Sequence, residues 1–66
     1  MQIYINGKHQ TIENEITITQ LLKELQVEEK IVAISLNSSV VKKDTWSQVA
    51  LKENDKLELL QFMSGG

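Results

Sequence analysis

The chain has 66 residues, a formal net charge of -2 and no cysteine. A chain of this length forms one domain and buries only about 60% of the surface that its unfolded form exposes, so a core and a separate catalytic cleft do not both fit. The absence of cysteine excludes disulfides and thiolate metal sites. The acidic balance argues against a nucleic-acid partner, because phosphates call for a basic face.

The composition, 41% hydrophobic and 24% charged residues, is that of an ordinary globular domain. The N-terminus carries no basic and then apolar leader, and no apolar run reaches the length of a membrane span. These features predict a cytoplasmic protein that does not act on membranes. The single histidine, His9, has no second histidine or cysteine with which to share a metal, and we expect it to face solvent.

Residues 1–6 alternate apolar and polar side chains, which is typical of a half-buried strand. The pair Asn6-Gly7 follows at once and predicts a type I′ hairpin turn, because that turn needs positive φ at both central residues. A return strand is expected over residues 8–13, with Ile12 as its contact with the core.

A helix is predicted to begin after Thr17. Thr17 and Gln20 have the spacing of a capping box, in which each side chain satisfies an unpaired backbone N–H of the other residue. Ile16 and Leu21 have the spacing of a hydrophobic staple. An apolar stripe with helical spacing then follows and indicates the face that packs on a sheet: Ile18, Leu21, Leu22 and Leu25.

Residues 31–36 form an apolar, β-branched run that predicts an interior strand. Its expected inward residues are Val32, Ile34 and Leu36, and the small residues Ala33 and Ser35 lie on the other face. A turn over residues 37–39 leads to a short strand at Val40 and Val41.

Lys42 and Lys43 end this short strand with charge, as expected at the edge of a sheet. Asp44 is expected to cap a single helical turn. We interpret Trp46 as a packing residue that covers one end of the core, rather than as an exposed anchor for a partner. Asn54, in a polar turn, is expected to adopt the left-handed conformation.

The last strand is predicted over residues 56–62, with Leu57 and Leu59 facing inward. Leu60 and Phe62 would then be apolar and exposed, and Tyr4 would lie beside Leu60 if the first and last strands are neighbours. A contiguous apolar patch of this kind suits the docking of a partner. Scattered apolar side chains on a surface are also common and need no function.

The predicted order is strand, strand, helix, strand, short strand, strand. A helix that crosses one face of the sheet allows the last strand to run parallel to the first, which gives an α+β roll. This order is compatible with a β-grasp, and other two-layer arrangements fit it as well.

The chain closes on Gly65-Gly66. Two residues without Cβ can pass through a narrow channel and make no side-chain contact with their own domain. The tail therefore indicates either a carboxylate that another protein must reach or merely a frayed end.

Several positions together resemble the ThiS family, the sulfur carrier proteins of thiamine biosynthesis: Asn37, Val40-Val41, Trp46, Asn54-Asp55 and the terminal Gly65-Gly66. The resemblance implies a ubiquitin-like β-grasp, with a mixed sheet of four to five strands packed on one helix. It divides the chain into a domain over residues 1–62 and a flexible tail over residues 63–66. Two turn residues depart from the pattern, since Asn54 stands where the family often has Gly and Lys42 where it often has Pro.

The resemblance also implies a chemistry for the tail. A ThiF-like adenylyltransferase would use ATP and Mg to adenylate the Gly66 carboxylate, and sulfur from a cysteine desulfurase persulfide would convert it to a thiocarboxylate. A ThiG-like thiazole synthase would then take the sulfur. The chain itself would be a co-substrate and not an enzyme, with no bound cofactor. Gly65, Ser64 and Met63 would form the arm, and we expect Phe62, Leu60 and Tyr4 to dock the partners.

Three other functions fit the same features. A small molybdopterin synthase subunit shares the fold, the tail and the activation. A ubiquitin-like protein modifier would join its tail to lysines. A plain interaction domain would have an incidental Gly-Gly end.

Overall fold

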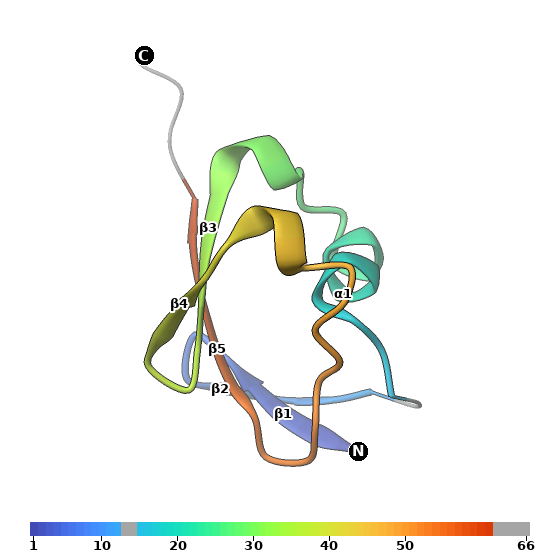
Figure 1. Cartoon of the computed structure of the whole chain (residues 1–66). Helices are drawn as coiled ribbons and strands as arrows, with labels where there is room; N and C mark the ends of the chain where they lie inside the picture. The colour runs from blue at the N-terminus through green and yellow to red at the C-terminus, as the bar shows by residue number, and fades with distance from the viewer. Residues whose placement is uncertain (13–14, 62–66) are drawn as a thin grey trace.

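The computed structural model describes residues 1–12 and 15–61. Five strands and three helical segments follow one another along the chain: β1 (Gln2–Ile5), β2 (Lys8–Thr11), α1 (Ile18–Leu25), η1 (Glu29–Ile31), β3 (Val32–Leu36), β4 (Ser39–Val41), η2 (Lys43–Thr45) and β5 (Lys56–Gln61). The strands form one sheet, and α1 lies on one side of it (Figure 1).

The strand order in the sheet is β2-β1-β5-β3-β4. β1 and β5 are parallel, whereas the pairs β1–β2, β3–β4 and β3–β5 are antiparallel. A mixed five-stranded sheet packed on one helix confirms the predicted α+β class and the β-grasp architecture. The last strand is therefore central in space, between the first and third strands.

The turns adopt the conformations expected from their sequences. Asn6 and Gly7 have φ of 50° and 82°, as a type I′ turn requires, and Asn54 has φ of 69°. The return strand is shorter than predicted, because β2 ends at Thr11. Ile12, directly after it, is buried as expected. Residue 13, the predicted end of that strand, lies outside the described residues.

The start of α1 confirms the capping box. The Thr17 hydroxyl accepts from the backbone N–H of Gln20 at 3.2 Å, and the Gln20 side-chain oxygen accepts from the backbone N–H of Thr17 at 2.9 Å. The helix ends at Leu25, and the C-cap residue, Gln26, has a left-handed backbone with φ of 59°. Its buried residues are Ile18, Leu21 and Leu22, and Leu25 is partly buried, so the predicted stripe faces the sheet.

The segment that precedes β5 closes the core beside α1. The Ile18 N–H donates to the Val49 carbonyl at 3.1 Å, and the Leu51 N–H donates to the Ile16 carbonyl at 2.8 Å. Trp46 is only 1% exposed, and its indole N–H donates to the Val41 carbonyl at 2.9 Å. The structural interpretation of Trp46 is confirmed: its ring lies in the core and its polar atom has a partner.

Two local expectations were wrong. Ile31, the first residue of the predicted interior strand, instead belongs to the short helix η1, so β3 begins at Val32. Lys42, and not Asp44, occupies the N-cap position of η2, and no side chain caps that helix. Asp44 lies in the first turn of η2, where its negative charge is favourable without a hydrogen bond.

Candidate functional site

The strand that leads toward the C-terminus is held in the middle of the sheet. β5 pairs with β1 on one side and with β3 on the other, and Gln61, the last described residue, lies opposite Val32. Leu57 is buried at the start of β5. The position of Gln61 is therefore fixed by its pairing with β3, and β5 lies between β1 and β3 in the sheet (Figure 1).

Asn6 extends the pairing between β1 and β5 with its side chain. Its Oδ1 accepts from the Leu59 N–H at 2.7 Å, and its Nδ2 donates to the Leu59 carbonyl at 3.3 Å. Its backbone N–H donates to the Leu57 carbonyl at 2.9 Å. Asn6, the residue after the end of β1, therefore binds the backbone of both Leu57 and Leu59, two successive inward-facing residues of β5.

Asn37 holds the beginning of β5 from the other side. Its backbone N–H donates to the Lys56 carbonyl at 2.7 Å, and its Oδ1 accepts from the Lys56 N–H at 2.9 Å. Its Nδ2 donates to the Asp55 carboxylate at 3.0 Å. The β3–β4 turn and the turn before β5 are therefore tied together.

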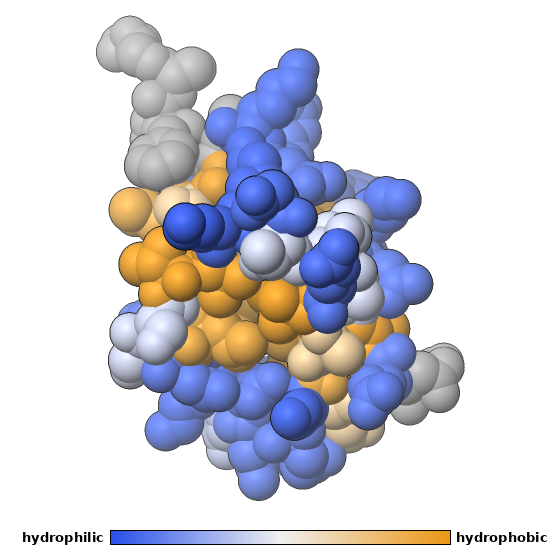
Figure 2. Space-filling view, in the orientation of Figure 1, coloured by the Kyte–Doolittle hydropathy of each residue, from blue (hydrophilic) through white to orange (hydrophobic). Residues whose placement is uncertain are grey.

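The outer face of the sheet carries an apolar groove that is open to solvent. Leu60 is 63% exposed and lies opposite Ala33, whereas Val40 is 82% exposed and lies opposite Ser35. The small side chains of Ala33 and Ser35 on β3 therefore form the floor of the groove, between the exposed apolar side chains described above. The residues that line the groove are Asn6, Ala33, Ile34, Ser35, Val40, Glu58, Leu59 and Leu60. Figure 2 shows hydrophobic side chains over the side of the molecule where β3, β4 and β5 lie in Figure 1.

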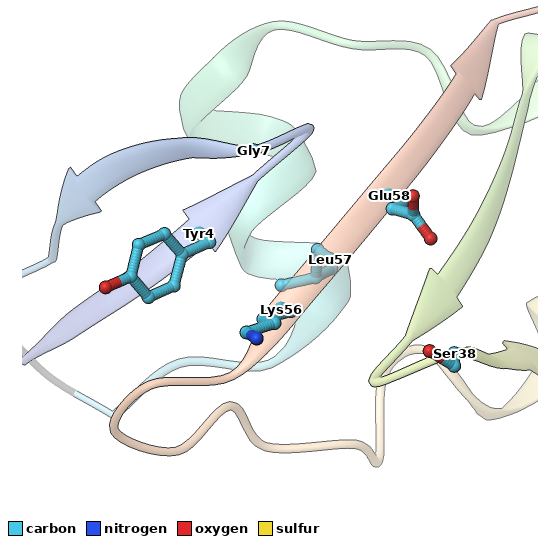
Figure 3. A pocket seen from close by; sticks show the side chains of 6 residues that line it. All are labelled: Tyr4, Gly7, Ser38, Lys56, Leu57 and Glu58. Carbon is cyan, nitrogen blue, oxygen red and sulfur yellow. The ribbon is translucent and has the colours of Figure 1, made fainter.

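The predicted patch contained one misplaced residue. β1 and β5 are neighbours, but Tyr4 lies opposite Lys56, four residues before Leu60. Tyr4 instead contacts His9 on β2, with ring centroids 5.3 Å apart. It lines a separate depression at the start of β5, together with Gly7, Ser38, Lys56, Leu57 and Glu58 (Figure 3).

Val40, and not Tyr4, is the second exposed apolar residue that lines the groove with Leu60. The sequence contained a signal for this position, because a tight turn at residues 37 and 38 pairs Val40 with Ser35 and so puts Val40 on the outer face. The other predicted site residues, Phe62, Met63, Ser64, Gly65 and Gly66, lie outside the described residues.

Residues 1–12 and 15–61, which the structure describes, contain neither a candidate membrane-spanning helix nor a candidate metal-binding cluster. None of the helices there has the length and apolarity needed to cross a membrane. The same ranges hold no group of three or more His, Cys, Asp or Glu residues that could bind a metal ion.

Comparisons with known proteins agree on one family. The model of the ThiS family matches residues 3–66. The sulfur carrier protein ThiS of Bacillus subtilis is 32% identical over 65 residues, which cover 97% of this chain and 98% of that protein. The crystal structure of a thiamine biosynthesis protein, ThiS, from Geobacter metallireducens superposes with a TM-score of 0.86 at 32% identity, and the match covers 100% of both chains.

A longer relative is also similar. A thiazole synthase of Paramagnetospirillum magneticum is 38% identical over 66 residues, which are 100% of this chain but 20% of that protein. The chain therefore spans about one fifth of the length of that relative. With a family match over nearly every residue and the same fold, this chain belongs to the ThiS family of sulfur carrier proteins.

Proposed function

We propose that this protein carries sulfur for thiazole formation in thiamine biosynthesis, as a thiocarboxylate on Gly66. The observation that carries the proposal is the family match, which extends over residues 3–66 and so includes the Gly-Gly segment. The central position of β5 supports it, because the pairing of β5 with β3 up to Gln61 fixes the place from which the chain continues toward Gly66.

A carboxylate must be activated before sulfur can replace one of its oxygens, because its charge is delocalised and oxide is a poor leaving group. A ThiF-like adenylyltransferase would join the Gly66 carboxylate to AMP at the expense of ATP, with Mg, and release pyrophosphate. A persulfide sulfur, supplied from cysteine by a desulfurase, would displace AMP. Reductive cleavage of the resulting acyl disulfide by a thiol would leave the thiocarboxylate. The chain acts as a co-substrate in this scheme, and the partners supply the catalytic groups.

The similarity to thiazole synthases supports a ThiG-like synthase as the acceptor. In two such proteins, a segment of one fifth of the length resembles all 66 residues of this chain, at 38% and 35% identity. A carrier on the same polypeptide as the enzyme that it serves is presented at high effective concentration. A carrier that is not joined to the synthase has to reach it by docking.

We place the docking surface at the groove between Leu60 and Val40. Gly66 is the fifth residue after Gln61, and a fully extended chain of that length spans at most about 18 Å. A partner that binds Leu60 therefore has to present its reactive centre within that distance of the end of β5. A docking role for Tyr4 remains a prediction. Tyr4 lies opposite Lys56, at the end of β5 away from Gln61, and this position does not favour such a role.

The direct test is the intact mass of the protein after incubation with a ThiF-like enzyme, Mg-ATP and a persulfide donor. We expect a gain equal to the difference between sulfur and oxygen, localised to Gly66 and absent when Gly66 is deleted. An unchanged mass, with an adenylyltransferase shown to be active on its own carrier, would contradict the proposal.

A further inference from the structure

The hairpin tip contains the dipeptide that is chemically least stable among the asparagine sequences of proteins. In an Asn-Gly pair the backbone nitrogen of glycine attacks the side-chain carbonyl carbon of asparagine, because no Cβ hinders its approach. Ammonia leaves, and a cyclic succinimide forms. Water then opens the ring to aspartate or isoaspartate. Overall one water is consumed, one ammonia is released and nothing is oxidised or reduced.

The folded protein holds Asn6 away from this reaction. Its side-chain oxygen and nitrogen both bond to the backbone of Leu59, at 2.7 and 3.3 Å. Ring closure requires the side-chain carbon to turn toward the nitrogen of Gly7, and that rotation breaks both bonds. Burial gives no protection, because Asn6 and Gly7 are exposed and a Cβ on Gly7 would meet no atom within 4 Å.

We propose that Asn6 is a latent deamidation site, which the pairing with Leu59 protects in the native fold and which is converted when β1 separates from β5. Chemistry that is slow relative to opening and closing follows the equilibrium population of the open form. The extent of conversion at Asn6 therefore records how much time a molecule has spent with this pair of strands apart.

The product opposes the return of β1 to β5. Aspartate replaces the Nδ2 donor by a second acceptor oxygen, which then faces the Leu59 carbonyl. Isoaspartate adds a methylene to the main chain next to the N–H that donates to Leu57. The aspartate loses one hydrogen bond and its carboxylate oxygen repels the Leu59 carbonyl oxygen, and the extra methylene of isoaspartate changes the position of the N–H relative to Leu57, so each product weakens the native pairing. The modification also changes the rim of the groove, since Asn6 lines it.

The first test compares the native protein with a synthetic peptide of residues 1–8. Cleavage after Lys8 releases the same peptide from the protein, and Asn6 is its only asparagine. Both samples are held at one mildly alkaline pH and temperature, and the aspartate and isoaspartate forms are quantified by chromatography and mass spectrometry. We expect conversion in the native protein to be at least about tenfold slower than in the peptide, because the open form is a minor population.

Equal rates in the native protein and the peptide would overturn the proposal. The full chain in a denaturing concentration of guanidinium chloride is expected to react like the peptide in the same solvent, and continued protection there would also overturn it. The proposal does not depend on the sulfur carrier function, and no partner enzyme enters the test.

The effect of the product is tested with Asn6→Asp. Asn54→Asp is the matched control, because it makes the same chemical change at another turn residue with positive φ. We expect a clearly lower midpoint of denaturant unfolding for Asn6→Asp, or failure to fold, and a smaller change for the control. Equal midpoints for Asn6→Asp and the wild type would refute the claim that the product weakens the pairing.

Discussion

Asn6 and Asn37, in different turns, share a left-handed backbone conformation and a side-chain hydrogen bond to β5. Each has φ of 50°, and each bonds to the backbone of β5 through its side chain. Glycine could adopt the backbone conformation but has no side chain to make these hydrogen bonds. Alanine cannot make the bonds either, and it would be strained in the left-handed conformation. Asparagine is the residue type that meets both requirements at low cost.

Asn37 provides the first prediction. We expect Asn37→Ala to lower the free energy of unfolding by about 2 kcal/mol, from the lost bonds and the strain of a left-handed alanine. Asn37→Gly removes the bonds and relieves the strain, so its loss should be about 1 kcal/mol. Urea unfolding measures both values. If glycine proves as costly as alanine, backbone strain does not contribute.

Leu60 provides the second prediction, which concerns the proposed docking groove. Leu60→Asp is expected to weaken binding to an adenylyltransferase or a thiazole synthase at least about tenfold, because a charge would have to be desolvated at the contact. Stability should change little, since Leu60 is exposed. Thr11→Asp is the control, with the same charge on β2 at the far edge of the sheet. Binding by calorimetry that is equal for the two variants would remove the groove from the mechanism.

At the scale of elements, α1 shows how local signals set the position of a short helix. With eight residues, Ile18–Leu25, it is too short to be stable alone in water and depends on its ends and its packing. The capping box fixes the start, and the left-handed Gln26 fixes the end. Thr17 also forms a bridge with Ala50, which joins the start of the helix to the segment before β5.

The capping box provides the third prediction. Thr17→Ala is expected to cost about 1 kcal/mol of unfolding free energy, because the Gln20 N–H loses its partner. Gln20→Ala removes the reciprocal bond. The two residues act as one unit, so the double variant should lose less than the sum of the single losses in thermal unfolding. Strict additivity would show that the two hydrogen bonds act independently.

At the scale of the whole molecule, stability depends on one small core. A domain of 66 residues is expected to have an unfolding free energy of roughly 3 to 10 kcal/mol. Within the described residues every buried core side chain is apolar apart from the indole N–H of Trp46, and that group has the Val41 carbonyl as partner. Trp46 joins the β4 end of the sheet to the segment beside α1.

Trp46 provides the fourth prediction. Trp46→Ala is expected to lose about 3 to 5 kcal/mol, which is a large part of the stability of a domain of this size, and to raise the unfolded fraction. Trp46→Phe keeps much of the ring and should fold, with a loss of about 1 to 3 kcal/mol from volume and the indole bond. Circular dichroism during heating distinguishes the two. A fully folded Trp46→Ala protein with an unchanged transition would contradict a central role for this residue.

Most elements of the fold were predictable because their signals are local. The Asn6-Gly7 turn, the capping box at Thr17 and the alternation over β5 all depend on residues within a few positions of one another. One failure was local as well: Asp44 has the chemistry of a cap, but η2 begins at Lys43, two residues before the position at which Asp44 could cap it. The predictions for Gly65 and Gly66 depend on the resemblance and on the family match, and remain proposals about chemistry.

The sequence by itself determined which face of each strand is apolar, since side chains alternate along a strand with a period of two. Only the tertiary structure decided which exposed residues share a surface. The register of β1 against β5 is set by backbone bonds between distant segments, such as Tyr4 N–H to the Asp55 carbonyl at 2.8 Å. Alternation says nothing about the offset of two strands that are some fifty residues apart. That offset separated Tyr4 from Leu60, and the strand order placed Val40 across β3 from Leu60 instead.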